Sequence, residues 1–217
     1  MKKQHAFALS ALAAVLIAGC ASSPSTADLD KLTADIVKAS FSDKGIVKVA
    51  VIAPEEINIA CSAAEVAGKP LNADVAEALQ AAQLKTIKWP TDGNYMGDWK
   101  AGEKLAQSGR GLTWTDAADT PNGGNCYNCH QMDPKEISFG TIGPSLTGYA
   151  KTRGVIADPT SPASKAIIEY TWGKIWNAKA YSACSVMPRA GHKGIMTEAQ
   201  VKDLMALLLD PKSPVNQ

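Results

Sequence analysis

The run Cys126-Tyr127-Asn128-Cys129-His130 constrains this 217-residue chain more than any other feature. A Cys-x-x-Cys-His segment places two thiols one turn apart with a histidine directly after them. This is the spacing that attaches a haem through two thioether bonds and gives its iron one axial ligand. A zinc-binding or thiol-redox Cys-x-x-Cys is the alternative interpretation. We therefore expect one covalent haem c, bound through Cys126 and Cys129 and ligated by His130.

The N-terminal residues have the pattern of an export signal, which suits haem attachment outside the cytoplasm. Two lysines precede an apolar stretch over residues 6–18 that is too short to span a bilayer permanently. The stretch ends in Leu-Ile-Ala-Gly before Cys20, which resembles the lipobox of bacterial lipoproteins. We expect residues 1–19 to be a signal peptide and Cys20 to anchor a periplasmic protein through a lipid. Ordinary cleavage at a neighbouring alanine is the alternative.

Composition excludes one large class of ligand. The sequence has 22 Lys and Arg against 21 Asp and Glu, a formal net charge of +1. It contains no polybasic run and no interleaving of basic and aromatic residues, so nucleic acid is not an expected partner. The chain that remains after removal of the signal is long enough for one large domain or two small ones.

Residues 20–94 are predicted to form a tether and a small α-rich extension. Apolar residues recur at helical spacing over residues 28–38, and Asn72 is suited to cap a helix that continues to Leu84. The partly alternating, β-branched segment 45–52 allows at best a short strand. Turn-forming residues at positions 89–94 indicate a domain boundary.

Residues 95–217 are predicted to be a haem domain with helices at both ends. Asp98 is suited to cap a helix over residues 99–108, and Thr197 with Gln200 has the pattern of a capping box at the start of the last helix. Gly102 would let these two helices cross closely, although a single helical glycine is equally a local defect. The apolar stripe of the last helix consists of Val201, Leu204, Met205 and Leu208.

The second axial position of the iron requires another side chain or stays open. Met187 is the best placed candidate, because it lies well beyond His130 in a loop that Pro188 stiffens. His192, another methionine and an open site are the alternatives. A thioether stabilises ferrous iron more than a second imidazole does, so Met187 would raise the reduction potential. The Pro144 carbonyl is a candidate acceptor for His130 Nδ1, with a plain Gly-Pro turn as the alternative.

Two cysteines remain once the haem motif and Cys20 are assigned. In an oxidising compartment, Cys61 and Cys184 are expected to form a disulfide that ties the extension to the Met187 loop, with two buried thiols as the alternative. Arg189 is a candidate for binding a haem propionate, although a solvated arginine is the more ordinary interpretation. Trp172 and Trp176 share a helical face, which indicates packing in the core or against haem.

Four stretches of the chain carry a resemblance to a known family. They are Gly124–His130, Gly140–Leu146, Met187–Arg189 and Leu204–Val215. Together these stretches resemble the SoxX family, the small cytochrome subunits of the bacterial thiosulfate-oxidising SoxAX complexes. The resemblance covers roughly residues 95–217. It implies a class I cytochrome c domain with one haem, so the whole chain is expected to be all-α, with the α-rich extension of residues 20–94 preceding this domain.

The resemblance also implies a function and a set of partners. In that family, a SoxA-type cytochrome subunit forms a heterodimer with the small subunit and joins thiosulfate to a cysteine of the SoxYZ carrier. The small subunit takes the released electrons and passes them to an acceptor such as a soluble cytochrome c. We therefore expect an electron-transfer subunit that performs no bond chemistry itself. A general periplasmic electron shuttle and a haem enzyme with an open distal site are the alternatives.

Overall fold

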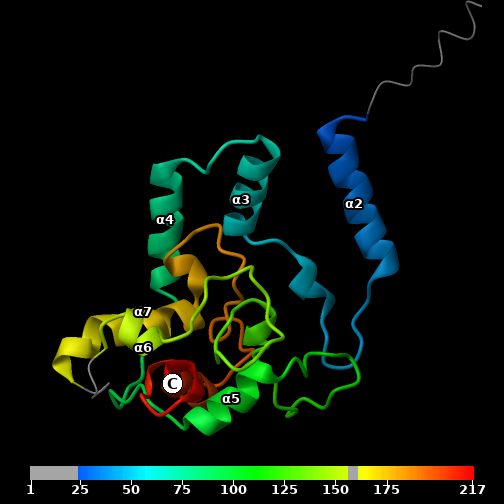
Figure 1. Ribbon diagram of the computed structural model, residues 1–217. Helices are drawn as coiled ribbons and strands as arrows, with labels where there is room; N and C mark the ends of the chain where they lie inside the picture. Colours follow the sequence, from blue (N-terminus) through cyan, green and yellow to red (C-terminus); the bar gives the residue numbers. More distant parts are fainter. Residues whose placement is uncertain (1–23, 156–160) are drawn as a thin grey trace, which may run out of the picture. The chain divides into compact units, whose positions relative to one another are not determined.

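The computed structural model describes residues 24–155 and 161–217, and these are helical (Figure 1). The all-α expectation is confirmed. The chain divides into two compact units, Met1–Asp43 and Lys44–Gln217. The expected signal peptide and the lipid-bearing Cys20 lie outside the described residues. None of the helices in the described ranges is both long and apolar enough to cross a bilayer.

The first unit contains helix α2, Thr26–Ser40, which covers the segment that the sequence predicts as helical. Its start is a capping box, in which Ser25 Oγ accepts from the Asp28 backbone N–H and the Asp28 carboxylate accepts from the Ser25 N–H. A Lys31–Asp35 pair adds an i, i+4 contact at 2.7 Å. No residue of α2 is buried, so local bonds rather than packing hold this helix within its unit.

The second unit begins with a turn where the sequence allows at best a short strand. Gly45 has a φ of +55°, which reverses the chain so that Lys44 and Val47 exchange two backbone hydrogen bonds of 3.0 Å. Residues Val49–Ile52 then form a 3₁₀ helix, η1. The strand is therefore absent, because the turn pairs the segment with itself and the described residues supply no neighbouring strand.

Two helices complete the extension. Helix α3 spans Glu56–Val66 and helix α4 spans Ala73–Leu84. Helix α4 has the predicted bounds, and Asn72 Oδ1 caps it by accepting from the backbone N–H groups of Asp74 and Val75. The sequence predicts a boundary between residues 94 and 95, but the whole segment 44–94 packs in one compact unit with residues 95–217.

The remaining elements surround the haem motif in the order that the sequence predicts for a haem domain. Helix α5 precedes the motif and helix α8 lies near the C-terminus, with α6 and α7 between them (Figure 1). The elements are α5 Trp99–Gln107, η2 Cys126–Asn128, α6 Tyr149–Thr152, η3 Pro162–Ser164, α7 Lys165–Trp176, η4 Ala178–Ala180, α8 Glu198–Leu209 and η5 Pro214–Asn216.

Helices α5 and α8 cross closely at Gly102, which settles the packing role that the sequence left open. A Cβ at this position would overlap the Asp203 backbone carbonyl and lie 3.0 Å from Leu207 Cβ. The crossing is also fixed at its edge, where the Asp203 carboxylate accepts from the Asp98 N–H at 2.9 Å and the Lys202 carbonyl accepts from the Gly97 N–H at 3.0 Å. Backbone contact at this point brings α5 and α8 together beneath the haem motif.

The core forms between α5, α7 and α8. The predicted stripe of α8 is buried, and the neighbouring Leu207 and Leu209 are buried as well. Trp172 and Trp176 of α7 stack with ring centroids 5.6 Å apart and an interplanar angle of 19°. Their expected packing role is confirmed for Trp172, which is fully buried and donates from Nε1 to the Lys88 carbonyl at 2.8 Å.

The close crossing at Gly102 predicts the direction in which an alanine at this position changes the stability of the protein. An alanine in an open helix stabilises it by about 0.5–1 kcal/mol relative to glycine. At Gly102 the added methyl group meets backbone, so we expect Gly102→Ala to lower the free energy of unfolding by about 1–3 kcal/mol. Urea unfolding of the exported holoprotein measures the change. A gain in stability would contradict the close crossing.

Candidate functional site

The Cys-x-x-Cys-His segment folds into a single tight turn. Residues Cys126–Asn128 form the 3₁₀ helix η2, and the Cys126 carbonyl accepts from the Cys129 N–H at 3.1 Å and the His130 N–H at 2.9 Å. Asn125 enters the turn in the left-handed conformation, with a φ of 51°, which asparagine tolerates better than most residues. The turn therefore presents two thiols and an imidazole from one short stretch of backbone.

Tyr127, between the two cysteines, fixes this turn to helix α5. It is buried, and its hydroxyl donates to the Glu103 carboxylate at 2.9 Å while accepting from the Asp133 N–H at 3.3 Å. Burial and the Glu103 carboxylate raise the pKa of Tyr127, so the phenol remains a donor at neutral pH. No pattern in the sequence predicts a role for Tyr127. Its contacts show that the residue between the cysteines sets the position of the turn against α5.

His130 is held on one side by the Gly143-Pro144 segment. Its Nδ1 lies 2.7 Å from the Pro144 carbonyl oxygen, which is the acceptor that the sequence suggested. A carbonyl only accepts, so Nδ1 carries the proton and Nε2 keeps its lone pair for a metal. The Gly143 N–H donates to the Cys129 carbonyl at 2.8 Å, and a Cβ on Gly143 would collide with the imidazole ring. The backbone therefore packs directly on the ring and sets its orientation.

The two thiols of the turn are free and half-buried. Cys126 and Cys129 are not bonded to each other. Burial raises the pKa of the Cys126 thiol to about 12. Across residues 24–155 and 161–217, no three His, Cys, Asp or Glu side chains gather as a metal would require.

Met187 lies in the loop between η4 and α8. Its side chain is half-buried and packs against the core, whereas Met132, Met196 and Met205 are fully buried within it. Met96 is the other half-buried methionine against the core, and it precedes α5. His192, the alternative imidazole, lies five residues after Met187, and its backbone N–H donates to the Trp176 carbonyl at 3.0 Å.

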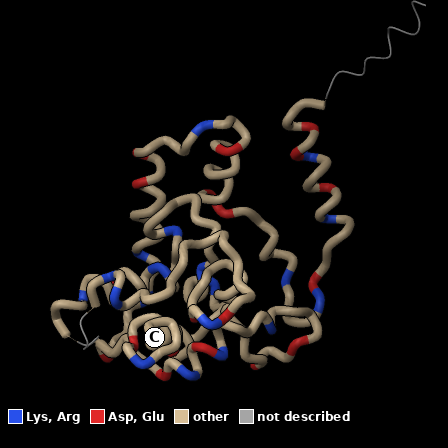
Figure 2. The backbone as a smooth tube through the Cα atoms, in the orientation of Figure 1, with Lys and Arg blue, Asp and Glu red and all other residues tan. Residues whose placement is uncertain are grey.

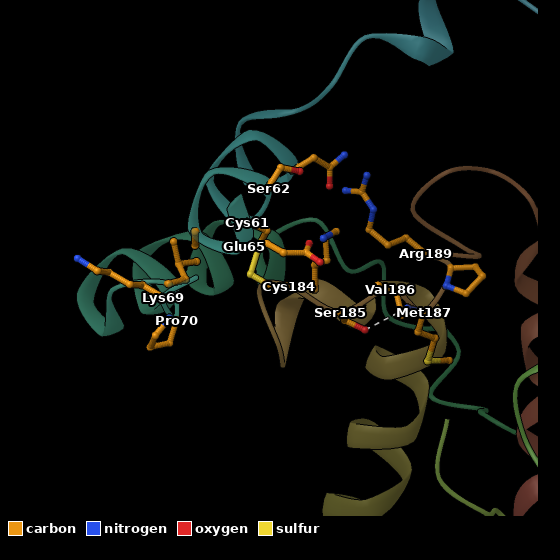
Figure 3. A pocket seen from close by; sticks show the side chains of 15 residues that line it. Cys61, Ser62, Glu65, Lys69, Pro70, Cys184, Ser185, Val186, Met187 and Arg189 are labelled. Atoms are coloured by element: carbon orange, nitrogen blue, oxygen red, sulfur yellow. Dashed lines mark hydrogen bonds between the residues drawn. A yellow bond between two sulfur atoms is a disulfide. The ribbon is translucent and has the colours of Figure 1, made fainter. Parts of the chain in front are cut away.

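The structure places Cys61 and Cys184 in a disulfide that joins α3 to the Met187 loop (Figure 3). The bond links residues 123 positions apart in the sequence. It lies in the wall of an open cavity of about 840 Å³ between α3 and the loop. Cys184 is exposed and Cys61 is half-buried, so this pair is not the two buried thiols of the alternative interpretation.

Arg189 has neither of the roles that the sequence suggested. Its side chain is only 7% exposed, and its guanidinium makes two hydrogen bonds, of 2.7 and 2.9 Å, to the Glu55 carboxylate. Lys193 also contacts Glu55. Hydrogen bonds from Arg189, and then from Lys193, lower the pKa of Glu55 to about 2, so this carboxylate is charged at neutral pH. No local pattern marks Glu55, because its partner lies 134 residues away.

The Trp176 indole bears on whether these residues fit a haem. Its side chain is buried, yet Nε1 has no hydrogen-bond partner among the described residues. A buried indole N–H normally donates to an acceptor. The ring also packs against Gly191 of the Met187 loop, where a Cβ would overlap it. An acid group such as a haem propionate would satisfy this donor.

The other lining residues also fit a flat apolar group. Several side chains in or near the motif and the loop are half-buried and pack against the core, which leaves apolar surface for a ring system. They include Leu105, Cys126, Leu146, Met187, Ala190 and Ile195. Together with two free thiols, a tautomer-fixed imidazole and an unpartnered indole N–H, these residues fit a covalently attached haem.

Comparisons with known proteins agree with this geometry. The model of the cytochrome c family matches residues 100–211, just over half of the chain. The chain is also similar to an uncharacterized lipoprotein of Aquifex aeolicus, with 38% identity over 151 residues. That alignment covers 68% of this chain and 66% of the relative, so the chain spans slightly less than two thirds of the relative's length.

Proposed function

Because this chain belongs to the cytochrome c family, we propose that it is a periplasmic electron-transfer subunit in which Cys126 and Cys129 attach one haem and His130 and Met187 ligate its iron. The family implies a covalent haem c and electron transfer. The haem supplies a one-electron couple between ferric and ferrous iron. The protein would attach this group through its two cysteines and supply its axial ligands.

The observation that carries this proposal is the placement of His130. The Pro144 carbonyl accepts the Nδ1 proton at 2.7 Å, and the Gly143 backbone packs against the ring. An imidazole held in this tautomer offers the Nε2 lone pair as a stronger metal ligand. The orientation of the ring is set before any metal binds. The same turn contributes the two thiols, so all three groups act on one cofactor.

The case for Met187 rests on where its loop lies and how exposed its thioether is. Met132, Met196 and Met205 are committed to the core, whereas Met187 is half-buried in a loop next to the unpartnered Trp176 indole. As the second ligand of the haem iron, the Met187 thioether would raise the reduction potential. This ligand set would favour accepting electrons and block direct binding of substrate.

We further propose that a partner subunit donates these electrons. The four stretches that resemble the SoxX family support a SoxA-type cytochrome subunit as partner, with thiosulfate and the SoxYZ carrier as its substrates and a soluble cytochrome c as acceptor. The bond-forming chemistry then takes place on the partner. Lysines and arginines are interspersed with acids along the described residues of the second unit (Figure 2).

We also propose that Cys20 carries a lipid that anchors the protein outside the cytoplasm. The support is the apolar leader that ends in Leu-Ile-Ala-Gly before Cys20, together with the name lipoprotein given to the Aquifex aeolicus relative. The polar residues 22–26 would serve as the tether between the lipid and the folded chain.

The axial ligand is tested by absorption spectroscopy of the ferric holoprotein. We expect wild type to show the weak sulfur-to-iron charge-transfer band and Met187→Ala to lose it. Met187→His should keep a six-coordinate haem but lower the reduction potential by on the order of 0.1 V, within the roughly 0.8 V range that axial ligands span. Met96→Ala, the other half-buried methionine, is the matched control. A band that persists in Met187→Ala would show that the ligand is wrong.

The partner is tested by purifying the tagged protein from its native host. We expect a stable one-to-one complex with a second c-type cytochrome, identified by mass spectrometry as a SoxA-type subunit. Thiosulfate should reduce the haem of this complex when SoxYZ is present. A chain that elutes alone and stays oxidised under these conditions is instead a general periplasmic electron shuttle.

A further inference from the structure

Two connections to the extension flank Met187 on either side. Three residues before it, Cys184 is bonded to Cys61 of α3. Two residues after it, Arg189 binds Glu55, the residue that immediately precedes α3. Figure 3 shows the disulfide, Met187 and Arg189 lining the same pocket. The loop segment that carries the proposed ligand is therefore attached at one end to α3 and at the other to the N-cap residue of the same helix.

The ion pair has the features of a strong attachment. Arg189 is buried, and its planar guanidinium uses two nitrogens on the two oxygens of Glu55, at 2.7 and 2.9 Å. Such bidentate, charge-assisted bonds fix orientation as well as position. Removing Glu55 would leave the buried Arg189 charge with only the neutral Gln83 Oε1 as an acceptor, so the pair resists opening.

Helix α4 adds a third contact to the same group. Gln83 Oε1 accepts from Arg189 Nη1 at 3.2 Å and from the fully buried Asn177 Nδ2 at 2.9 Å. Asn177 follows the last residue of α7, so one amide oxygen joins α4, the end of α7 and the Met187 loop. The contact ties the arginine to the core as well as to α3.

The loop itself supplies little internal support between these connections. The Ser185 N–H donates to the Ser182 carbonyl at 3.0 Å, and the Met187 N–H donates to Ser185 Oγ at 3.2 Å (Figure 3). These bonds join near neighbours in the sequence. Segments held mainly by local bonds at the surface open more easily than the core does.

We propose that Glu55, Cys61 and Gln83 form a clamp that positions Met187 as an axial ligand. The inference rests on the proposed haem ligation and adds a role for residues 53–84. Without the clamp, the 184–189 segment would open more often, and the thioether would leave the iron for a larger share of the time. The extension is then part of the haem site, where its three clamp residues act through Met187.

Ligand exchange at the ferric iron measures this opening, because cyanide binds a six-coordinate haem only after the thioether has left. The variants are the double substitution of Cys61→Ser with Cys184→Ser, which leaves no free thiol, and Glu55→Gln, which keeps the disulfide. We expect each to bind cyanide about tenfold faster than wild type or more, as the full-length holoprotein. We also expect the sulfur-to-iron band to weaken in both.

Asp92→Asn is the matched control. Asp92 also lies before α5 and also pairs with a lysine of the haem domain, since Lys202 Nζ is 3.0 Å from its carboxylate, but it touches no residue of the 184–189 segment. We expect this variant to bind cyanide at the wild-type rate. Rates that rise equally in Asp92→Asn and in the clamp variants would reflect a general loss of stability and overturn the clamp.

The failures of the two proposals have different signatures. Wild type without the sulfur-to-iron band, or Met187→Ala with it, overturns the ligand set. Wild type with the band, together with clamp variants that bind cyanide at the wild-type rate, overturns the clamp alone. If the double cysteine variant does not fold, Glu55→Gln decides the question, because its fold keeps the covalent link.

Discussion

The hydrogen bond from His130 Nδ1 to the Pro144 carbonyl is the interaction on which the site depends. It fixes the imidazole tautomer, and the Gly143 backbone beside it fixes the plane of the ring. This geometry holds only if the turn that carries His130 is itself immobile. Tyr127 provides that condition by binding Glu103 of α5, and the Gly102 crossing holds α5 against α8. Backbone packing far from the ring therefore determines where the imidazole nitrogen lies.

The two sides of the site are supported in different ways. The His130 side is built from the motif itself and from a segment that follows it within 14 residues. The Met187 side depends on contacts that reach back across the sequence, through the Cys61–Cys184 disulfide and the Glu55–Arg189 pair. If His130 and Met187 ligate the haem iron as we propose, both supports would keep the ligands in place in both oxidation states and so reduce the reorganisation that accompanies each electron transfer.

How far the sequence predicts this structure depends on how local each signal is. Helices α4, α5 and α8 are predictable because Asn72, Asp98 and Thr197 cap them with side-chain hydrogen bonds. Helices α3 and α7 begin without a side-chain cap, so their starts carry no comparable signal. The Cys61–Cys184 pairing follows from counting cysteines, whereas the Glu55–Arg189 pair joins two single charges 134 residues apart. For this reason the sequence predicts a solvated or propionate-binding Arg189, and only the structure identifies Glu55 as its partner.

The proposed function requires that one porphyrin is attached at both cysteines of the turn. Peptide mass spectrometry of the exported protein measures this directly, because trypsin cleavage after Arg110 and Lys135 releases residues 111–135, which contain Cys126 and Cys129. We expect this peptide to carry the added mass of a single haem and to contain no free thiol. The same peptide without haem, with its two thiols free or joined to each other, would contradict it.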